Sequence, residues 1–175
     1  MTGRAPRDMR ALVVYESLWG NTEQVARAIA TEFGLVMPVD IVDSDAAPDT
    51  VDAYDFVAVG GPTHAFSMSR LSTRREAVGQ HGAPGAPERG IREWLAGLGA
   101  TSRRSRAITF DTRVNAPRLP GSAAKAAKYE LRSLGLEVVA SKTFRVHGYG
   151  GPLIDGELER AREWAHTVVQ ATSAA

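Results

Sequence analysis

The sequence contains no cysteine. This absence excludes disulfide bonds, thiolate metal sites and a cysteine nucleophile, and it makes a cytoplasmic location the expectation. The four histidines are scattered along the chain, and none has the HExxH spacing of a zinc site. The sequence therefore predicts no metal site.

Long hydrophobic runs are also absent. Residues Met1 to Arg10 include three arginines, and only five apolar or aromatic residues, Ala11 to Tyr15, follow before Glu16. That stretch is too short for the apolar region of a secretory signal or for a membrane-spanning helix. We therefore expect no contact with a membrane.

Two common nucleotide-binding motifs are missing. The chain has neither the GxxxxGK[ST] sequence of a P-loop nor the GxGxxG sequence of a dinucleotide-binding turn. A P-loop nucleotidase is therefore disfavoured.

Charge is balanced overall but divided along the chain. The net charge is +1, yet residues 11–69 hold nine acidic residues and one arginine, whereas residues 70–118 hold ten arginines and four acidic residues. The arginines lack the interleaved aromatic residues of an RNA-binding motif, and solvated helix faces explain most of them. We therefore expect no nucleic-acid partner.

The arrangement of apolar residues predicts a three-layer α/β fold. At 175 residues the chain is expected to form a single domain, 1–175, with its core at about 9–169. Short apolar runs predict five strands, at 10–15, 35–42, 54–60, 106–111 and 136–146. Between and after them, helices are predicted at 22–34, 68–78, 91–98, 122–134 and around 158–168. Alternating strands and helices imply right-handed βαβ units, and hence a doubly wound parallel sheet with helices on both faces.

Particular residues place the strands within this sheet. The run at 10–15 is apolar throughout and should be central, whereas Pro38 places the second strand at an edge. Residues 79–90 contain four glycines and two prolines and are predicted to be a plain surface loop rather than a lid.

Ligands of such sheets bind beyond the carboxyl ends of the strands. The loops to inspect are therefore 16–22, 60–69 and 111–121. The first offers the hydroxyls of Ser17 and Thr22, with Gly20 and Asn21 between them, and it leads into a helix whose N-terminus favours a phosphate. Asn21 is the expected N-cap, with Gln24 completing a capping box. An ordinary helix-capping turn is the alternative interpretation.

Two sequences at these positions resemble the flavodoxin family. They are YESLWGNT at 15–22 and GGPTH at 60–64, and the similarity spans roughly 9–169. The resemblance implies non-covalently bound FMN and a five-stranded parallel sheet of order 2-1-3-4-5. It assigns the FMN phosphate to Ser17, Leu18, Trp19, Gly20, Asn21 and Thr22. It places two groups beside the isoalloxazine: Gly61, Pro62, Thr63, His64 and Phe66 from the second loop, and Asp111, Thr112 and Arg113 from the third.

The chain departs from the family pattern in three ways. Trp19 stands where flavodoxin phosphate loops usually carry a third hydroxyl, and the third loop lacks the tyrosine that stacks on the flavin in many flavodoxins. Electron-shuttling flavodoxins are also typically acidic, whereas this chain is near neutral. These differences weaken a pure shuttle role.

Four side chains each have more than one interpretation. Trp19 lies over the ribityl chain or flavin edge, or it plugs the loop. His64 binds the flavin pyrimidine or acts as a catalytic proton donor, unless it is an ordinary lone histidine. Phe66 covers a flavin face or belongs to the core. Arg113 points to solvent or places a cation near the pyrimidine edge, which would make reduction of the flavin more favourable.

The leading functional prediction is an FMN-binding redox protein that passes electrons between a donor and a redox partner protein. An alternative is an NAD(P)H-dependent quinone or nitro-compound reductase using the same flavin. A third is a flavin-less binding module in which Trp19 closes the phosphate site. The donor, the acceptor and the oligomeric state stay open.

Overall fold

Five parallel strands form the sheet of the computed structural model, which describes residues 8–174. The strands are β1 (Ala11–Tyr15), β2 (Val39–Asp43), β3 (Phe56–His64), β5 (Arg106–Val114) and β6 (Glu137–Val146). Their order is β2-β1-β3-β5-β6, which confirms the order 2-1-3-4-5 when parallel strands are counted along the chain. A two-residue strand that the sequence did not predict, β4 (Ser67–Met68), pairs antiparallel with β3. Of the residues examined for a secretory signal, 1–7 lie outside the described range.

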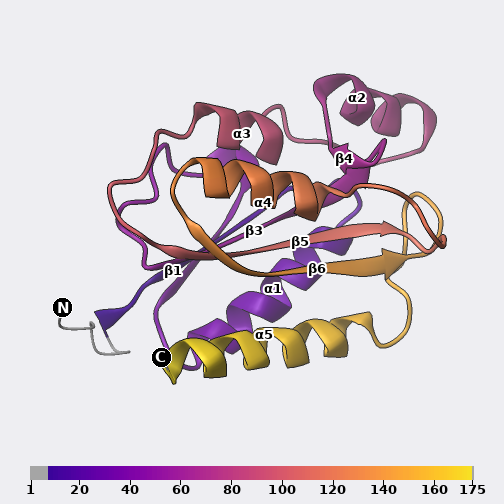
Figure 1. Ribbon diagram of the computed structural model, residues 1–175. Helices are drawn as coiled ribbons and strands as arrows, with labels where there is room; N and C mark the ends of the chain where they lie inside the picture. Colours follow the sequence, from indigo (N-terminus) through magenta and orange to yellow (C-terminus); the bar gives the residue numbers. More distant parts are fainter. Residues whose placement is uncertain (1–7, 175) are drawn as a thin grey trace.

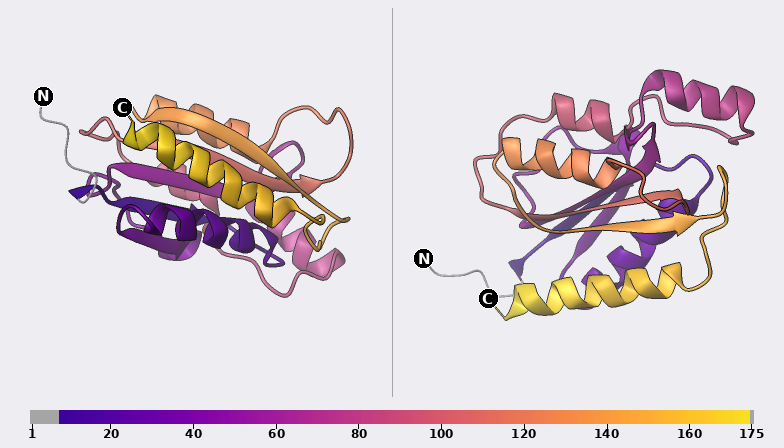
Figure 2. Two further views of the ribbon diagram at one scale, coloured as in Figure 1. Left: turned by 90° about the horizontal axis from the view of Figure 1, so that it is seen from below. Right: turned by 45° about the vertical axis from the view of Figure 1, so that its right-hand side comes forward.

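Helices cover both faces of this sheet, so the predicted three-layer arrangement is confirmed (Figure 1). One face carries α1 (Asn21–Gly34) and α5 (Glu157–Ser173), and the other carries α3 (Ile91–Gly97) and α4 (Ala123–Ser133). Helix α2 (Leu71–Gln80) projects beyond the sheet near the carboxyl ends of the strands, as both views of Figure 2 also show. A single turn of 3₁₀ helix, Ser44–Ala46, follows β2.

Strand β1 lies inside the sheet, between β2 and β3, and both of its faces are apolar. Leu12 and Val14 pack toward α3 and α4, whereas Val13 packs toward α1 and α5, and all three are completely buried. Alternate residues of a strand point to opposite faces, so a run without polar residues can be covered on both sides.

The second strand begins four residues later than predicted. The chain leaves α1 in tight turns in which the N–H groups of Val36 and Met37 both donate to the carbonyl of Phe33, at 3.1 and 3.0 Å. Pro38 therefore precedes the strand, where its carbonyl accepts a hydrogen bond from Ala11 N. The edge position predicted from this proline is confirmed.

Strands β3 and β5 extend further than predicted. Pairing continues through Gly61 with Asp111 and Pro62 with Thr112, so residues expected in loops form strand ends. Gly60 permits this extension, because a Cβ atom there would lie 2.1 Å from the Phe110 ring. The third predicted loop therefore begins only after Val114.

The predicted caps and bounds of two helices are wrong in detail. Gly20, with φ of 93°, is the N-cap of α1 and makes no side-chain cap bond. Asn21 is the first helical residue instead, and its amide donates to the carbonyl of Gly150 at 3.0 Å. Helix α2 begins at Leu71 rather than at Met68, because Met68 belongs to β4.

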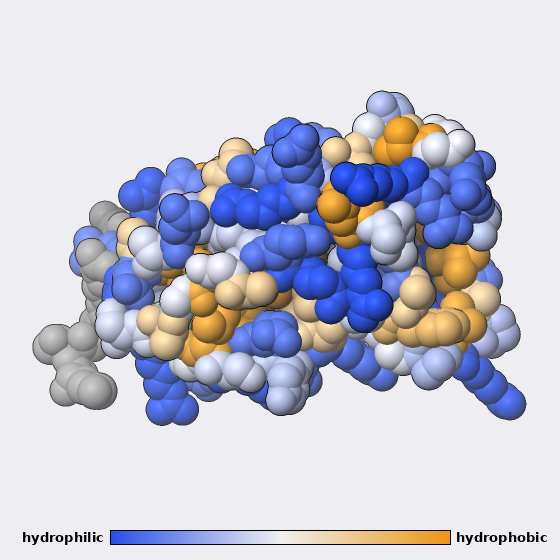
Figure 3. All heavy atoms as spheres, turned by 90° about the horizontal axis from the view of Figure 1, so that it is seen from above, coloured by the Kyte–Doolittle hydropathy of each residue, from blue (hydrophilic) through white to orange (hydrophobic). Residues whose placement is uncertain are grey.

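The surface over α2, α3 and α4 is mainly hydrophilic, with small apolar patches between charged side chains (Figure 3). No helix within residues 8–174 is long and apolar enough to cross a membrane. The same residues contain no cluster of three or more side chains suited to hold a metal ion.

Candidate functional site

A cavity of about 520 Å³ lies where the parallel strands end. Cofactor pockets typically measure about 300–1,000 Å³, so its size suits a bound cofactor. Ten of the fourteen residues that the sequence predicted line it: Ser17, Leu18, Trp19, Asn21, Thr22, Pro62, Thr63, His64, Thr112 and Arg113. Residues from all three inspected regions therefore meet in one cavity.

The loop between β1 and α1 forms one end of the cavity. The Ser17 hydroxyl accepts a hydrogen bond from Gly20 N at 3.1 Å, which closes a tight turn. Thr22 is buried, and its hydroxyl shares a 2.7 Å hydrogen bond with the hydroxyl of Thr112. The first N–H groups of a helix lack intrahelical partners, and the helix dipole is positive there. Hydroxyl and N–H donors for an anion therefore gather at this end.

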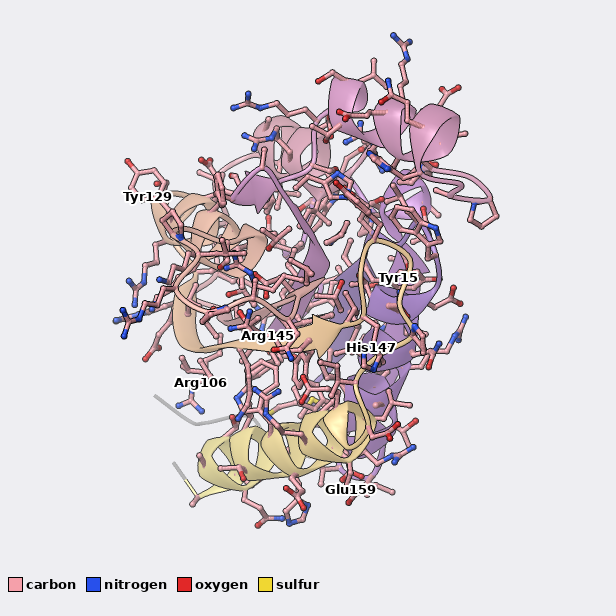
Figure 4. The ribbon with its side chains drawn as sticks, turned by 90° about the vertical axis from the view of Figure 1, so that its right-hand side faces the viewer. Tyr15, Arg106, Tyr129, Arg145, His147 and Glu159 are labelled. Carbon is pink, nitrogen blue, oxygen red and sulfur yellow. The ribbon has the colours of Figure 1, made fainter. Side chains whose placement is uncertain are left out.

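A glycine-rich loop that follows β6 packs directly on this turn. Besides the bond from Asn21 to Gly150, a Cβ atom on Gly150 would lie 3.0 Å from the Trp19 ring, and one on Gly151 would lie 2.4 Å from Asn21 Nδ2. Figure 4 shows the loop beyond His147 passing in front of α1 when the molecule is seen from the carboxyl edge of the sheet. Only glycine permits this close approach at both positions.

Trp19 combines features of both predicted roles. Its ring lines the cavity, and it also packs against Gly150 and against a small apolar cluster of Leu18, Ala77 and Ala83. The side chain is therefore part of the cavity wall and is supported from behind by the glycine-rich loop. It leaves the cavity open.

His64, at the end of β3, is held in a neutral form. Its Nδ1 lies 3.0 Å from the hydroxyl of Thr73, which itself donates to the carbonyl of Arg70. Since that hydroxyl proton is already used, we assign the ring proton to Nδ1, and Nε2 is left as an acceptor. Burial, with a further contribution from the Arg74 charge, lowers the pKa of His64 to about 4. A histidine with this pKa is a poor proton donor at neutral pH.

Arg113, near the end of β5, is buried rather than pointing to solvent. It is 7% exposed and lines the cavity. One guanidinium nitrogen donates to the carbonyl of Gly121 at 2.7 Å, while Nε is buried without a partner. Within residues 8–174 the guanidinium forms no ion pair. A buried cation therefore borders the cavity.

Asp111 supports the cavity from behind. It is completely buried and does not line the cavity; its Oδ2 accepts 3.0 Å hydrogen bonds from the Thr63 hydroxyl and from Ala124 N at the start of α4. Its Oδ1 has no hydrogen-bond partner. The carboxylate thus fixes the ends of β3 and β5 relative to α4.

Three other predicted residues also lie outside the cavity lining. Gly20 shapes the first turn, and Gly61 is buried where a Cβ atom would lie 2.8 Å from Ile91. Phe66 is 51% exposed, with φ of 67°, and its side chain is not part of the wall. The prediction that Phe66 covers the flavin therefore finds no support in its position.

The sequence interpretation missed one complete wall of the cavity. Helix α2 contributes Thr73, Glu76 and Ala77, and His81 follows it. The His81 ring stacks on Tyr149 from the loop after β6, with centroids 4.0 Å apart and ring planes 12° from parallel. The strand-end rule could have pointed to Tyr149, because that loop also follows a parallel strand. The sequence of α2 carries no comparable signal, and residues 79–90 are predicted to be a plain surface loop.

A buried polar network holds α2 in place. Glu16 is completely buried; its Oε2 accepts a 2.5 Å hydrogen bond from Ser69, and its Oε1 accepts one from Ile91 N at 3.0 Å. Arg74 of α2 donates to Ser69 at 2.9 Å and to both carboxylate oxygens of Glu93. Burial raises the pKa of Glu16. Burial also acts to raise the pKa of Glu93, but the hydrogen bond and charge of Arg74, together with backbone hydrogen bonds, outweigh it and lower that pKa.

Together, the fold and the cavity define an open, doubly wound α/β protein with a cavity at the carboxyl edge of its sheet, where proteins of this architecture bind ligands. The family model described as flavodoxin matches residues 13–74. That segment contains the loop after β1, β3 and the start of α2. The match supports the resemblance to the flavodoxin family over this segment.

Solved flavodoxin structures have the same fold. Flavodoxin 1 from Bacillus cereus is 16% identical, with a TM-score of 0.64, over 92% of this chain and 97% of that one. The Streptococcus pneumoniae TIGR4 flavodoxin is 18% identical, with a TM-score of 0.64, over 93% and 99%. Two-electron reduced Megasphaera elsdenii flavodoxin is 17% identical, with a TM-score of 0.57, over 90% and 98%. Comparison with curated proteins gives no match.

Proposed function

We propose that this protein binds FMN non-covalently and transfers electrons through it. The observation that carries the proposal is the cavity of about 520 Å³ between the start of α1 and the ends of β3 and β5. Its two ends differ chemically in the way that FMN requires. One end offers hydroxyl and helix N–H donors for a phosphate, and the other offers apolar surface, polar strand ends and a buried arginine.

The residues present fit this cofactor. The phosphate would be held by the hydroxyls of Ser17 and Thr22 and by N–H groups of the first turn of α1, with no lysine needed. The Nε atom of Arg113 is a buried donor without a partner at the cavity, and the Nε2 atom of His64 is an acceptor. Both suit the polar edge of an isoalloxazine, which carries carbonyl acceptors and an N–H donor.

FMN would supply reversible uptake of electrons, and the chain would supply its position. The walls formed by Trp19 and α2 would exclude water from one side of the cofactor, while the glycine-rich loop keeps the phosphate-binding turn in place. His64, being neutral, would accept a hydrogen bond rather than provide a proton. The redox partner would be another protein that meets the exposed rim of the cavity.

An NAD(P)H-dependent quinone or nitro-compound reductase is the second candidate function. The observation that favours it is the buried, unpaired charge of Arg113, because a cation beside a flavin promotes full reduction. The flavin-less alternative is disfavoured, because Trp19 forms part of the wall and leaves the cavity open.

The absorbance spectrum of the purified protein tests the proposal. We expect flavin absorbance, with FMN as the flavin released on denaturation and identified by chromatography. Bleaching by NADPH alone, followed by reoxidation with a quinone, would select the reductase, whereas bleaching only through an added reductase protein would select the electron carrier. Protein without flavin that also fails to bind added FMN would refute both.

A further inference from the structure

Arg113 is a buried cation without a carboxylate partner. It is 7% exposed, and among residues 8–174 no carboxylate lies within ion-pair distance of its guanidinium. Burying an unpaired charge is costly, and such a charge is usually neutralised or paired. Within residues 8–174, its guanidinium donates a hydrogen bond to a neutral carbonyl, that of Gly121. The charge of Arg113 is therefore still available to an anionic group in the cavity.

Two carboxylates lie in this region, and within residues 8–174 neither forms an ion pair with Arg113. Asp111, two residues earlier on β5, is buried and accepts hydrogen bonds from Thr63 and the start of α4, and it does not line the cavity. Glu76 lines the cavity but is exposed, and it lies 3.7 Å from His81. Water screens an exposed carboxylate much more than a buried guanidinium. Among the residues that line the cavity, Arg113 is therefore the buried charged side chain.

Arg113 and the proposed phosphate donors are directed to opposite faces of the sheet. Thr112 faces Thr22 and α1, whereas the Arg113 guanidinium reaches Gly121 before α4, on the other face of the sheet. If a phosphate sits at the start of α1, the part of FMN that reaches Arg113 is the isoalloxazine.

We propose that Arg113 lies beside the isoalloxazine and brings its two one-electron reductions close together in potential, so that this protein exchanges electrons in pairs. The inference rests on the proposed binding of FMN. Uptake of two electrons and one proton gives the flavin ring one negative charge, and the second electron brings that charge. A cation in a low-dielectric site stabilises it, so the second reduction becomes more favourable.

This inference names the class of reaction partners. A donor that delivers two electrons as a hydride, such as NAD(P)H, suits a flavin that would be reduced by two electrons in one step. An acceptor that takes two electrons and two protons, such as a quinone becoming a quinol, suits the reoxidation of that flavin. Carriers of single electrons would be poorer partners, because they need the two steps to be well separated.

Reductive titration with spectroelectrochemical readout tests the proposal on the FMN-loaded protein. We expect the wild type to pass from the oxidised to the fully reduced spectrum in one two-electron step. In Arg113→Gln, the second midpoint should fall by at least the equivalent of a tenfold change in equilibrium constant, about 59 mV for a one-electron couple. Reduced FMN should correspondingly bind at least tenfold more weakly, while oxidised FMN binds within threefold of the wild type.

Two matched variants separate charge from structure. Arg113→Lys keeps the positive charge and should retain the single step. Arg118→Gln removes the same charge from an exposed position on the following loop and should leave both midpoints unchanged. An equal effect of Arg118→Gln would contradict a local role for Arg113.

The outcomes distinguish this inference from the proposed function. If FMN does not bind to the wild type, the proposed function fails. If FMN binds but the wild type and Arg113→Gln have the same separation between midpoints, only the role of Arg113 fails. Should Arg113→Gln not fold, the wild-type titration decides, because two well-separated steps would overturn the proposal and a single step would support it.

Discussion

The guanidinium of Arg74 lies 4.0 Å from the carboxylate of Glu16, and both side chains are almost completely buried. The Ser69 hydroxyl bridges them, donating to Glu16 and accepting from Arg74. Gly90 allows this approach, because a Cβ atom there would lie 2.1 Å from Glu16 Oε1 and 2.5 Å from the guanidinium. The network joins the residue just before the turn between β1 and α1 to helix α2, which forms one wall of the cavity.

Replacing Arg74 with methionine should strongly destabilise the protein. The change leaves the Glu16 carboxylate buried without its nearest cation, and breaking a buried pair from one side typically costs about 3–5 kcal/mol. Urea unfolding followed by circular dichroism measures the loss. Arg75→Met, at an exposed position of the same helix, is the control and should change the free energy of unfolding by less than about 1 kcal/mol. Equal effects of the two substitutions would show that the network contributes nothing.

His64 should remain uncharged from pH 5 upward. Its pKa in the folded protein is lowered to about 4, whereas the unfolded chain titrates near 6.5, so the unfolded state binds more protons in this range. Stability should therefore fall as the pH drops from 6.5 to 4, by at most about 3 kcal/mol from this residue. Comparing wild type and His64→Gln by unfolding across this range should show that their difference shrinks as the pH falls.

An NMR titration of the folded protein checks the protonation of His64 directly. An NMR titration in which the His64 ring changes protonation near pH 6.5 would contradict the neutral assignment and would revive its role as a proton donor.

Gly151→Ala should weaken FMN binding by disturbing the first turn of α1. The added Cβ atom would lie 2.4 Å from Asn21 Nδ2, so the Asn21 side chain must move and lose its bond to Gly150. Gly156→Ala is a matched control, since its φ of 90° is close to the 87° of Gly151 but a Cβ atom there meets nothing within 4 Å. Both variants should lose about 1–2 kcal/mol of stability to backbone strain, but only Gly151→Ala should lose FMN affinity in titrations.

Thr22→Val should lower FMN affinity about tenfold to a hundredfold while preserving shape, because a hydrogen bond to a charged group is worth about 1.5–3 kcal/mol. Thr112→Val removes the hydroxyl that pairs with Thr22 but leaves the Thr22 hydroxyl in place. It should therefore cost less affinity, as isothermal titration calorimetry can measure. A greater loss in Thr112→Val would mean that the Thr22 hydroxyl does not face the phosphate.

The fold could be predicted because its signals are local. The apolar run at 10–15 requires cover on both faces, and Pro38 requires an edge, so central and edge positions follow from the residues themselves. The predicted ends of β3 and β5 come too early in the sequence. The extension of these strands depends on the Phe110 ring lying over Gly60, which is a contact between two strands. The sequence of either strand alone does not indicate such a contact.

The site was only partly predictable for the same reason. The strand-end rule identifies residues at or just after the ends of β1, β3 and β5, and most of them meet in the cavity. Asn21 is predicted as a helix cap, because the sequence around it gives no sign of its hydrogen-bond partner in the fold. That partner is the carbonyl of Gly150, which is 129 residues away. His81 reaches the cavity because the Arg74 network anchors α2. Its stacking partner, Tyr149, lies far along the chain, in the loop after β6.

The most direct test of the account is a fluorescence titration of apoprotein with FMN and with riboflavin, which differ only in the phosphate. The account predicts that FMN binds at least a hundredfold more tightly, because the hydroxyls of Ser17 and Thr22 and the start of α1 act on that group alone. Equal affinities for the two flavins would contradict the phosphate site on which the proposed function depends.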